Sequence, residues 1–77
     1  MYIINKKTRY PTSWPYEGPA CEVADIPRGK VYRHVSEAIF HAKKLTLYNP
    51  VGFVVIRISA DKVLGKNQFN HEKVFET

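Results

Sequence analysis

The chain has 77 residues, of which 44% are hydrophobic, and a formal net charge of +5 from 12 Lys and Arg against 7 Asp and Glu. A chain of this length makes one domain and buries roughly 60% of the surface that its unfolded form exposes, so we expect no large enclosed active-site cavity. The hydrophobic content is too high for a disordered chain, and no run reaches the roughly 18 apolar residues of a membrane span.

The sequence predicts a cytoplasmic protein. Its single cysteine, Cys21, cannot form an internal disulfide, which is typical of a reducing compartment. The apolar run at residues 1–4 is too short for a signal peptide, and its charges, Lys6 and Lys7, follow it instead of preceding it.

The N-terminal part is predicted to be a short strand and then an irregular arm. Tyr2-Ile3-Ile4 is a β-type run. Prolines then recur at positions 11, 15 and 19, and proline fixes φ and removes a hydrogen-bond donor. We interpret residues 8–19 as an extended arm that is rich in turns and aromatic side chains.

A β-hairpin is predicted to follow the arm. Residues 20–25 and 31–35 have the length and apolar content of strands. Pro27 and Gly29 mark a turn between them. Arg28 and Lys30 would make the tip of this hairpin basic.

Residues 36–48 are predicted to form the one main helix. Ser36 is a favourable N-cap, and Val35 and Phe40 have the spacing of a hydrophobic staple. Asn49-Pro50 then ends the helix, because the residue before proline resists the helical conformation.

The helix has two apolar lines. At 100° per residue the core-facing line contains Ala38, Ala42 and Leu45. Phe40 and Leu47 point to the other side and are flanked by Lys43 and Lys44. One interpretation is that the arm folds back over this second line, and the other is that the line stays exposed.

Two more strands, at 51–58 and 69–75, are predicted with a single helical turn at 60–64 between them. The expected fold class is α+β, with an antiparallel sheet of about four or five strands in the order β-β-β-α-β-β and the helix packed on one face. The predicted core contains Ile3, Val23, Val31, Ala38, Ile39, Ala42, Leu45, Phe53, Val55, Ile56 and Ile58.

The sequence carries no catalytic or metal-binding signature. His34, His41, His71 and Cys21 are scattered, without the paired local ligands of a zinc site. The four glycines are isolated, which excludes a glycine-rich phosphate loop. We therefore expect no catalytic residue, no metal and no cofactor.

A small metal-free ribonuclease is one enzyme alternative. Such enzymes use a few side chains on a sheet as general acid, general base and phosphate clamp. The candidates on predicted strands are Arg33, His34, Arg57 and His71.

The leading hypothesis is a non-enzymatic protein that binds a larger protein or nucleoprotein assembly and so modulates or inhibits it. Rigid aromatic side chains dominate interface hot spots, and basic groups steer acidic partners. In size, single domain and lack of catalytic motifs, the chain resembles the small accessory proteins of phages and mobile elements, although no aligned motif carries this resemblance. The expected partner contacts are Tyr10, Trp14, Tyr16, Arg28, Lys30, Lys43 and Lys44.

The alternative hypothesis is a nucleic-acid-binding module. Basic residues interleave with aromatic ones in the first half of the chain, and these residue types hold phosphates and stack on unpaired bases. The residues of this alternative are Lys6, Lys7, Arg9, Arg28, Lys30, Tyr32 and Arg33.

Overall fold

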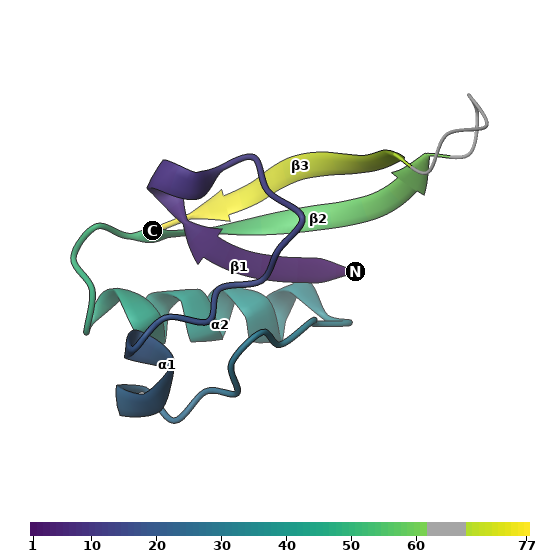
Figure 1. The fold of residues 1–77 in the computed structure, drawn as a ribbon. Helices are drawn as coiled ribbons and strands as arrows, with labels where there is room; N and C mark the ends of the chain where they lie inside the picture. The colour runs from purple at the N-terminus through teal and green to yellow at the C-terminus, as the bar shows by residue number, and fades with distance from the viewer. Residues whose placement is uncertain (62–67) are drawn as a thin grey trace.

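The computed structural model describes residues 1–61 and 68–77, and the side chains of residues 1–59 and 70–77. Three strands, β1 (Tyr2–Lys6), β2 (Phe53–Asp61) and β3 (Gln68–Glu76), form an antiparallel sheet in the order β1-β2-β3. The main helix, α2 (Val35–Thr46), lies along one face of the sheet (Figure 1). The α+β class is confirmed, but the predicted four or five strands exceed the three in the described residues.

The central strand β2 is buried on both faces, as its continuous apolar run indicates. Phe53 and Val55 belong to the larger core cluster under α2. Val54 and Ile56 belong to a smaller cluster on the opposite face, together with Ile3 of β1. Alternation along the strand therefore divides one apolar run between two cores.

The helix begins one residue earlier than predicted, at Val35, with His34 as its N-cap and no side-chain cap. Ser36 lies inside the first turn, so its assignment as N-cap was wrong. Val35 and Ile39 pack against the main core. Residues four apart lie on the same face of a helix, so the packing of both side chains on the core favours a helix that begins at Val35.

The predicted hairpin does not form. Residues Ala20–Val23 form a short helix, α1, whose buried Ala20, Cys21 and Ala24 have helical spacing. The second predicted strand is reduced to an isolated bridge between Tyr32 and Tyr2.

Two valines of the failed hairpin consequently leave the predicted core. Val23 is 62% exposed and Val31 is 47% exposed. Seven predicted core residues are buried and two, Ile39 and Ile58, are partly buried and pack against the core clusters. The seven are Ile3, Ala38, Ala42, Leu45, Phe53, Val55 and Ile56.

The strand at the C-terminal end is confirmed, since β3 covers the predicted 69–75. The strand β2 continues to Asp61, so the start of the helical turn predicted at 60–64 is strand instead. The rest of that turn, 62–64, lies outside the described residues.

The arm is irregular, as predicted, apart from a 3-10 turn, η1 (Lys7–Arg9). Figure 1 shows it crossing in front of β1 and descending to α1. The backbone N–H of Tyr16 donates to the carbonyl of Ile4 at 2.8 Å, and the Tyr16 ring meets Phe53 edge-on at 4.9 Å between centroids. The arm therefore covers the β1 edge of the core.

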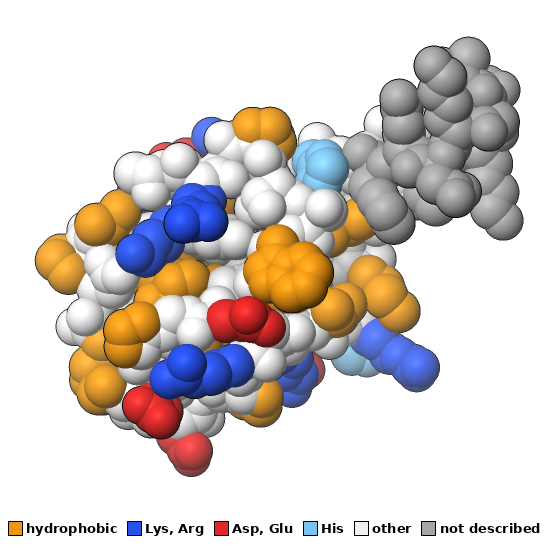
Figure 2. All heavy atoms as spheres, viewed as in Figure 1, with side chains coloured by type: hydrophobic (Ala, Val, Ile, Leu, Met, Phe, Trp, Pro, Cys, Tyr) orange, Lys and Arg blue, Asp and Glu red, His pale blue; other side chains and the backbone are white. Residues whose placement is uncertain are grey.

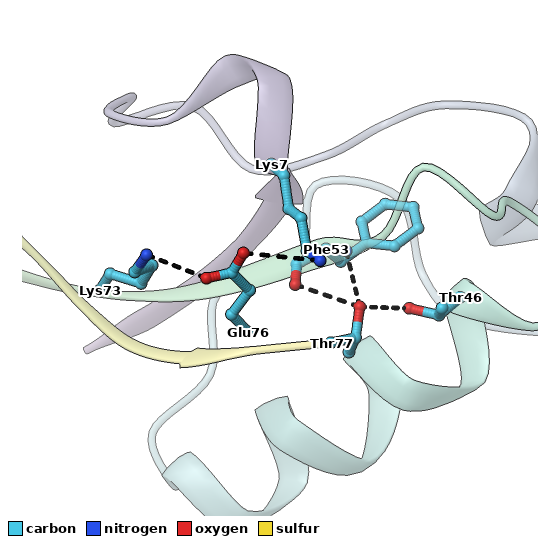
Figure 3. Close-up of polar contacts among 6 residues, drawn as sticks. All are labelled: Lys7, Thr46, Phe53, Lys73, Glu76 and Thr77. Carbon is cyan, nitrogen blue, oxygen red and sulfur yellow. Dashed lines mark hydrogen bonds and ion pairs between the residues drawn. The ribbon is translucent and has the colours of Figure 1, made fainter.

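Polar contacts fasten the end of β3 to the rest of the fold (Figure 3). Glu76 lies between Lys73, at 2.9 Å, and Lys7, at 3.5 Å. The hydrogen bond from Lys73 lowers the pKa of the Glu76 carboxyl. Thr77 Oγ1 accepts from the backbone N–H of Phe53 at 2.9 Å and lies 2.7 Å from Thr46 Oγ1 of α2.

Candidate functional site

Two large hydrophobic side chains project from α2 into solvent. Phe40 is 64% exposed and Leu47, the C-cap residue, is 80% exposed. Seven residues are nearly two helical turns, so Phe40 and Leu47 lie on the same side of the helix. That side is opposite the buried line of Ala38, Ala42 and Leu45. The arm does not cover this line, so the interpretation that it folds back over Phe40 and Leu47 was wrong.

A lysine flanks this line on each side. Lys43 and Lys44 lie in the last turn of α2, where cations also stabilise the negative end of the helix dipole. Neither lysine makes an ion pair with a described side chain. We call Phe40, Lys43, Lys44 and Leu47 the outer face of α2.

A second exposed aromatic group is Trp14 in the arm, which is 67% exposed. Two hydrogen bonds fix its backbone: its carbonyl accepts from Asn5 Nδ2 at 2.6 Å, and its backbone N–H donates to Thr12 Oγ1 at 3.1 Å. One further hydrogen bond involves the ring, whose indole Nε1 donates to Glu17 Oε2 at 3.3 Å. The arm therefore positions the backbone of Trp14, and the contact with Glu17 favours one orientation of the indole.

Trp14 lines a groove of about 390 Å³ between the arm and the end of β1. Two cations, Lys6 and Arg9, and one carboxylate, Glu17, line the same groove, and neither cation makes an ion pair with the side chains described. Figure 2 shows exposed hydrophobic side chains among basic ones on the face that carries the arm. We call Lys6, Arg9 and Trp14 the arm groove residues.

The structure divides the predicted contact surface into two. The arm crosses the β1 edge of the sheet, whereas Lys43 Nζ lies 5.7 Å from the ring of Phe75 in β3, at the opposite edge. Trp14 and Lys43 therefore lie toward opposite edges of the three-stranded sheet, and their participation in one interface stays a prediction.

Two predicted aromatic contacts are buried. Tyr16 is 9% exposed and belongs to the main core with Tyr32. Little of either residue is accessible to a partner, although Tyr16 contributes to the lining of the groove beside Trp14. Tyr10, by contrast, keeps a partly exposed side chain next to the groove-lining segment.

Most of the other predicted cations are engaged within the protein. Arg28 pairs with Glu22 at 3.4 Å, and Lys30 pairs with Glu37 at 2.7 Å. Lys7 pairs with Glu76. Arg33 is exposed and makes no ion pair with a described side chain, so it stays open to solvent.

Two residues of the ribonuclease alternative lie on different faces of the sheet. Arg57 pairs with Glu72 across the sheet. His71 is adjacent to Glu72 in β3, and neighbouring strand residues point to opposite faces. Arg57 and His71 therefore do not share one face, whereas Arg33 and His34 are both exposed next to each other before α2, and the ribonuclease alternative stays a prediction.

The buried thiol and the buried tyrosine act as structural groups. Cys21 is 1% exposed, and burial raises the pKa of its thiol, which disfavours the reactive thiolate. The Tyr32 hydroxyl lies 2.6 Å from His41 Nδ1, and burial raises the pKa of Tyr32. The hydroxyl therefore stays protonated, and a hydrogen bond joins it to the His41 ring.

His41 gives the fold a predictable pH response. Burial lowers the pKa of His41 below its ordinary 6.5, so the unfolded chain binds a proton first as the pH falls below that value. Stability is thus full above about pH 6.5 and decreases from there down to the lower folded pKa. We expect the melting temperature of His41→Gln to decrease less than that of the wild type between about pH 7.5 and 5.

An unchanged slope in His41→Gln would show that other groups cause the response.

Sequence reasoning missed Asn5, which holds the arm. Asn5 is 5% exposed. Its side-chain amide donates to Trp14 O, and its side-chain oxygen accepts from the backbone N–H of Lys6 at 2.8 Å. The signal was a polar residue at a strand position whose same-face neighbour, Ile3, is apolar. A buried amide in such a place needs hydrogen-bond partners.

Comparisons with protein families, curated proteins and solved structures found no match for this chain. Within residues 1–61 and 68–77, no helix has the length and hydrophobicity needed to cross a membrane. Among the same residues, no three His, Cys, Asp or Glu side chains form a group that could hold a metal ion. The function therefore has to be argued from the two exposed surfaces.

Proposed function

We propose that this is a non-enzymatic binding protein that docks the outer face of α2 onto a larger protein assembly and thereby modulates or inhibits it. The observation that carries the proposal is the exposure of Phe40 and Leu47 on a helix whose opposite face is fully packed. The lone, buried Cys21 supports a cytoplasmic setting for this role.

Burial of these two side chains would supply much of the binding free energy. Fully burying a Phe or Leu side chain contributes roughly 1.5–3 kcal/mol. A helix that presents apolar side chains two turns apart fits an apolar groove of a partner. Helix-dipole stabilisation explains Lys43 and Lys44 on their own, but it does not explain why Phe40 and Leu47 face water.

The lysines define the chemistry of the partner. Lys43 and Lys44 flank the apolar line without an acidic partner in the described part of the chain. A partner groove with acidic residues along its rim would complement them and would speed association. We therefore propose an acidic-rimmed apolar groove on a protein as the occupant.

A capture experiment with a matched control tests this function. The tagged protein is used to capture partners from the cell extract of its source, beside the double variant Phe40→Asp/Leu47→Asp. The control is Val23→Asp/Val31→Asp, which adds the same charge at exposed valines away from the outer face. We expect one partner protein to be retained by the wild type and the control and lost by the Phe40/Leu47 variant.

The salt dependence of capture provides a second criterion. Lys43→Gln/Lys44→Gln should weaken capture mainly at low salt, because salt screens exposed charges. A partner that both double-Asp variants lose equally, or that neither loses, would contradict docking through the outer face.

A further inference from the structure

We infer a second binding site, in the arm groove, for an unpaired nucleotide of single-stranded DNA or RNA. It differs from the proposed function in both surface and ligand, since it uses Lys6, Arg9 and Trp14 and none of the outer face of α2. The groove combines an exposed indole, whose nitrogen donates to Glu17, with two cations, and this combination carries the inference.

The platform is preorganised. An exposed tryptophan usually loses rotational freedom when a ligand stacks on it, and that loss weakens binding. Here Asn5, Thr12 and Glu17 already hold the backbone and the indole edge of Trp14. Because the contact with Glu17 uses the ring edge, it leaves the π-face for a base, and such stacking contributes roughly 1–3 kcal/mol per base.

The charges give the bound nucleotide a direction. Lys6 and Arg9 line the groove from β1 and η1, and Glu17 lines it from the arm, where its carboxylate contacts the indole nitrogen. A phosphate is attracted to the two cations and repelled by the carboxylate. The base therefore stacks on Trp14 with its phosphate toward Lys6 and Arg9.

The size of the groove favours a single strand. Its volume of about 390 Å³ lies at the small end of ligand sites, which span roughly 300–1,000 Å³. A groove of that size suits a single small unit such as one nucleotide. In a duplex both faces of each base are already stacked, so the indole could not reach them without flipping a base out.

Fluorescence anisotropy of a labelled oligothymidylate tests the inference, with a duplex of equal length for comparison. We expect the 77-residue chain to bind the single strand more tightly than the duplex at low salt. Trp14→Ala should weaken binding about 5- to 150-fold at an unchanged melting temperature. Lys6→Gln and Arg9→Gln should each flatten the dependence of log affinity on log salt by roughly 0.7.

Arg33→Gln is the matched control, because it removes one exposed, unpaired charge outside the groove. The inference is overturned if the control weakens binding as much as Arg9→Gln, if duplex binds as well as single strand, or if neither binds at low salt. A change in Trp14 fluorescence on adding poly-glutamate, without any oligonucleotide binding, would also overturn the inference. It would assign the groove to an acidic protein. The double variant Phe40→Asp/Leu47→Asp should bind the oligonucleotide normally, which separates this test from that of the proposed function.

Discussion

Replacing Tyr16 with alanine is expected to reduce the free energy of unfolding by about 3–5 kcal/mol. The ring is buried and meets Phe53 edge-on, so its removal opens a cavity in the main core. Stabilities of small domains are about 5–15 kcal/mol, so this loss is a large part of the total and should lower the urea midpoint markedly. Urea denaturation followed by circular dichroism measures the change.

Trp14→Ala is the control in the same arm. Although it removes a larger side chain two residues away, most of that side chain is in solvent, and we expect a loss below about 1 kcal/mol. Equal losses of unfolding free energy in the two variants would mean that both rings or neither ring belongs to the core. That result would contradict the placement of the arm, in which Tyr16 is buried and Trp14 is exposed.

Replacing Asn5 with leucine should detach the arm while leaving the sheet intact. The substitution removes the hydrogen bonds to Trp14 O and to the Lys6 N–H, and unsatisfied buried polar groups cost about 1–3 kcal/mol each. We expect this loss of stability together with faster proteolysis of residues 8–19. Thermal unfolding and limited proteolysis measure the two effects.

Asn70→Leu is the matched control, since Asn70 is an exposed asparagine within β3. It should change stability by less than about 0.5 kcal/mol and leave proteolysis of the arm unchanged. A stable Asn5→Leu variant with a protected arm would show that the Asn5 contacts do not position Trp14.

The local periodicities were the parts of the fold that the sequence predicted well. The 100° spacing separated Ala38 and Ala42 from Phe40 and Leu47, because a helix fixes directions from neighbouring residues alone. The continuous run in β2 likewise indicated burial on both faces. Each of these inferences depends on contacts within one element or on one face of it.

The course of residues 10–34 could not be predicted in the same way. The segment 20–25 has the composition of a strand, but Gly18 and Pro19 precede it and it folds as the short helix α1. The arm is placed by Asn5 and by the Tyr16–Phe53 contact, which join residues distant in sequence. Local sequence patterns do not reveal these long-range contacts. They therefore could not predict that Tyr16 is buried or that Trp14 and Lys43 lie toward opposite edges of the sheet.

The docking of the outer face of α2 is the central claim, and hydroxyl-radical footprinting tests it most directly. The protein is oxidised alone and in complex with the partner that it captures, and the modification of each side chain is read by mass spectrometry. Phe40 and Leu47 should be oxidised in the free protein and protected in the complex, while Val23 remains equally reactive in both. Unchanged oxidation of Phe40 and Leu47 in a saturated complex would contradict the account.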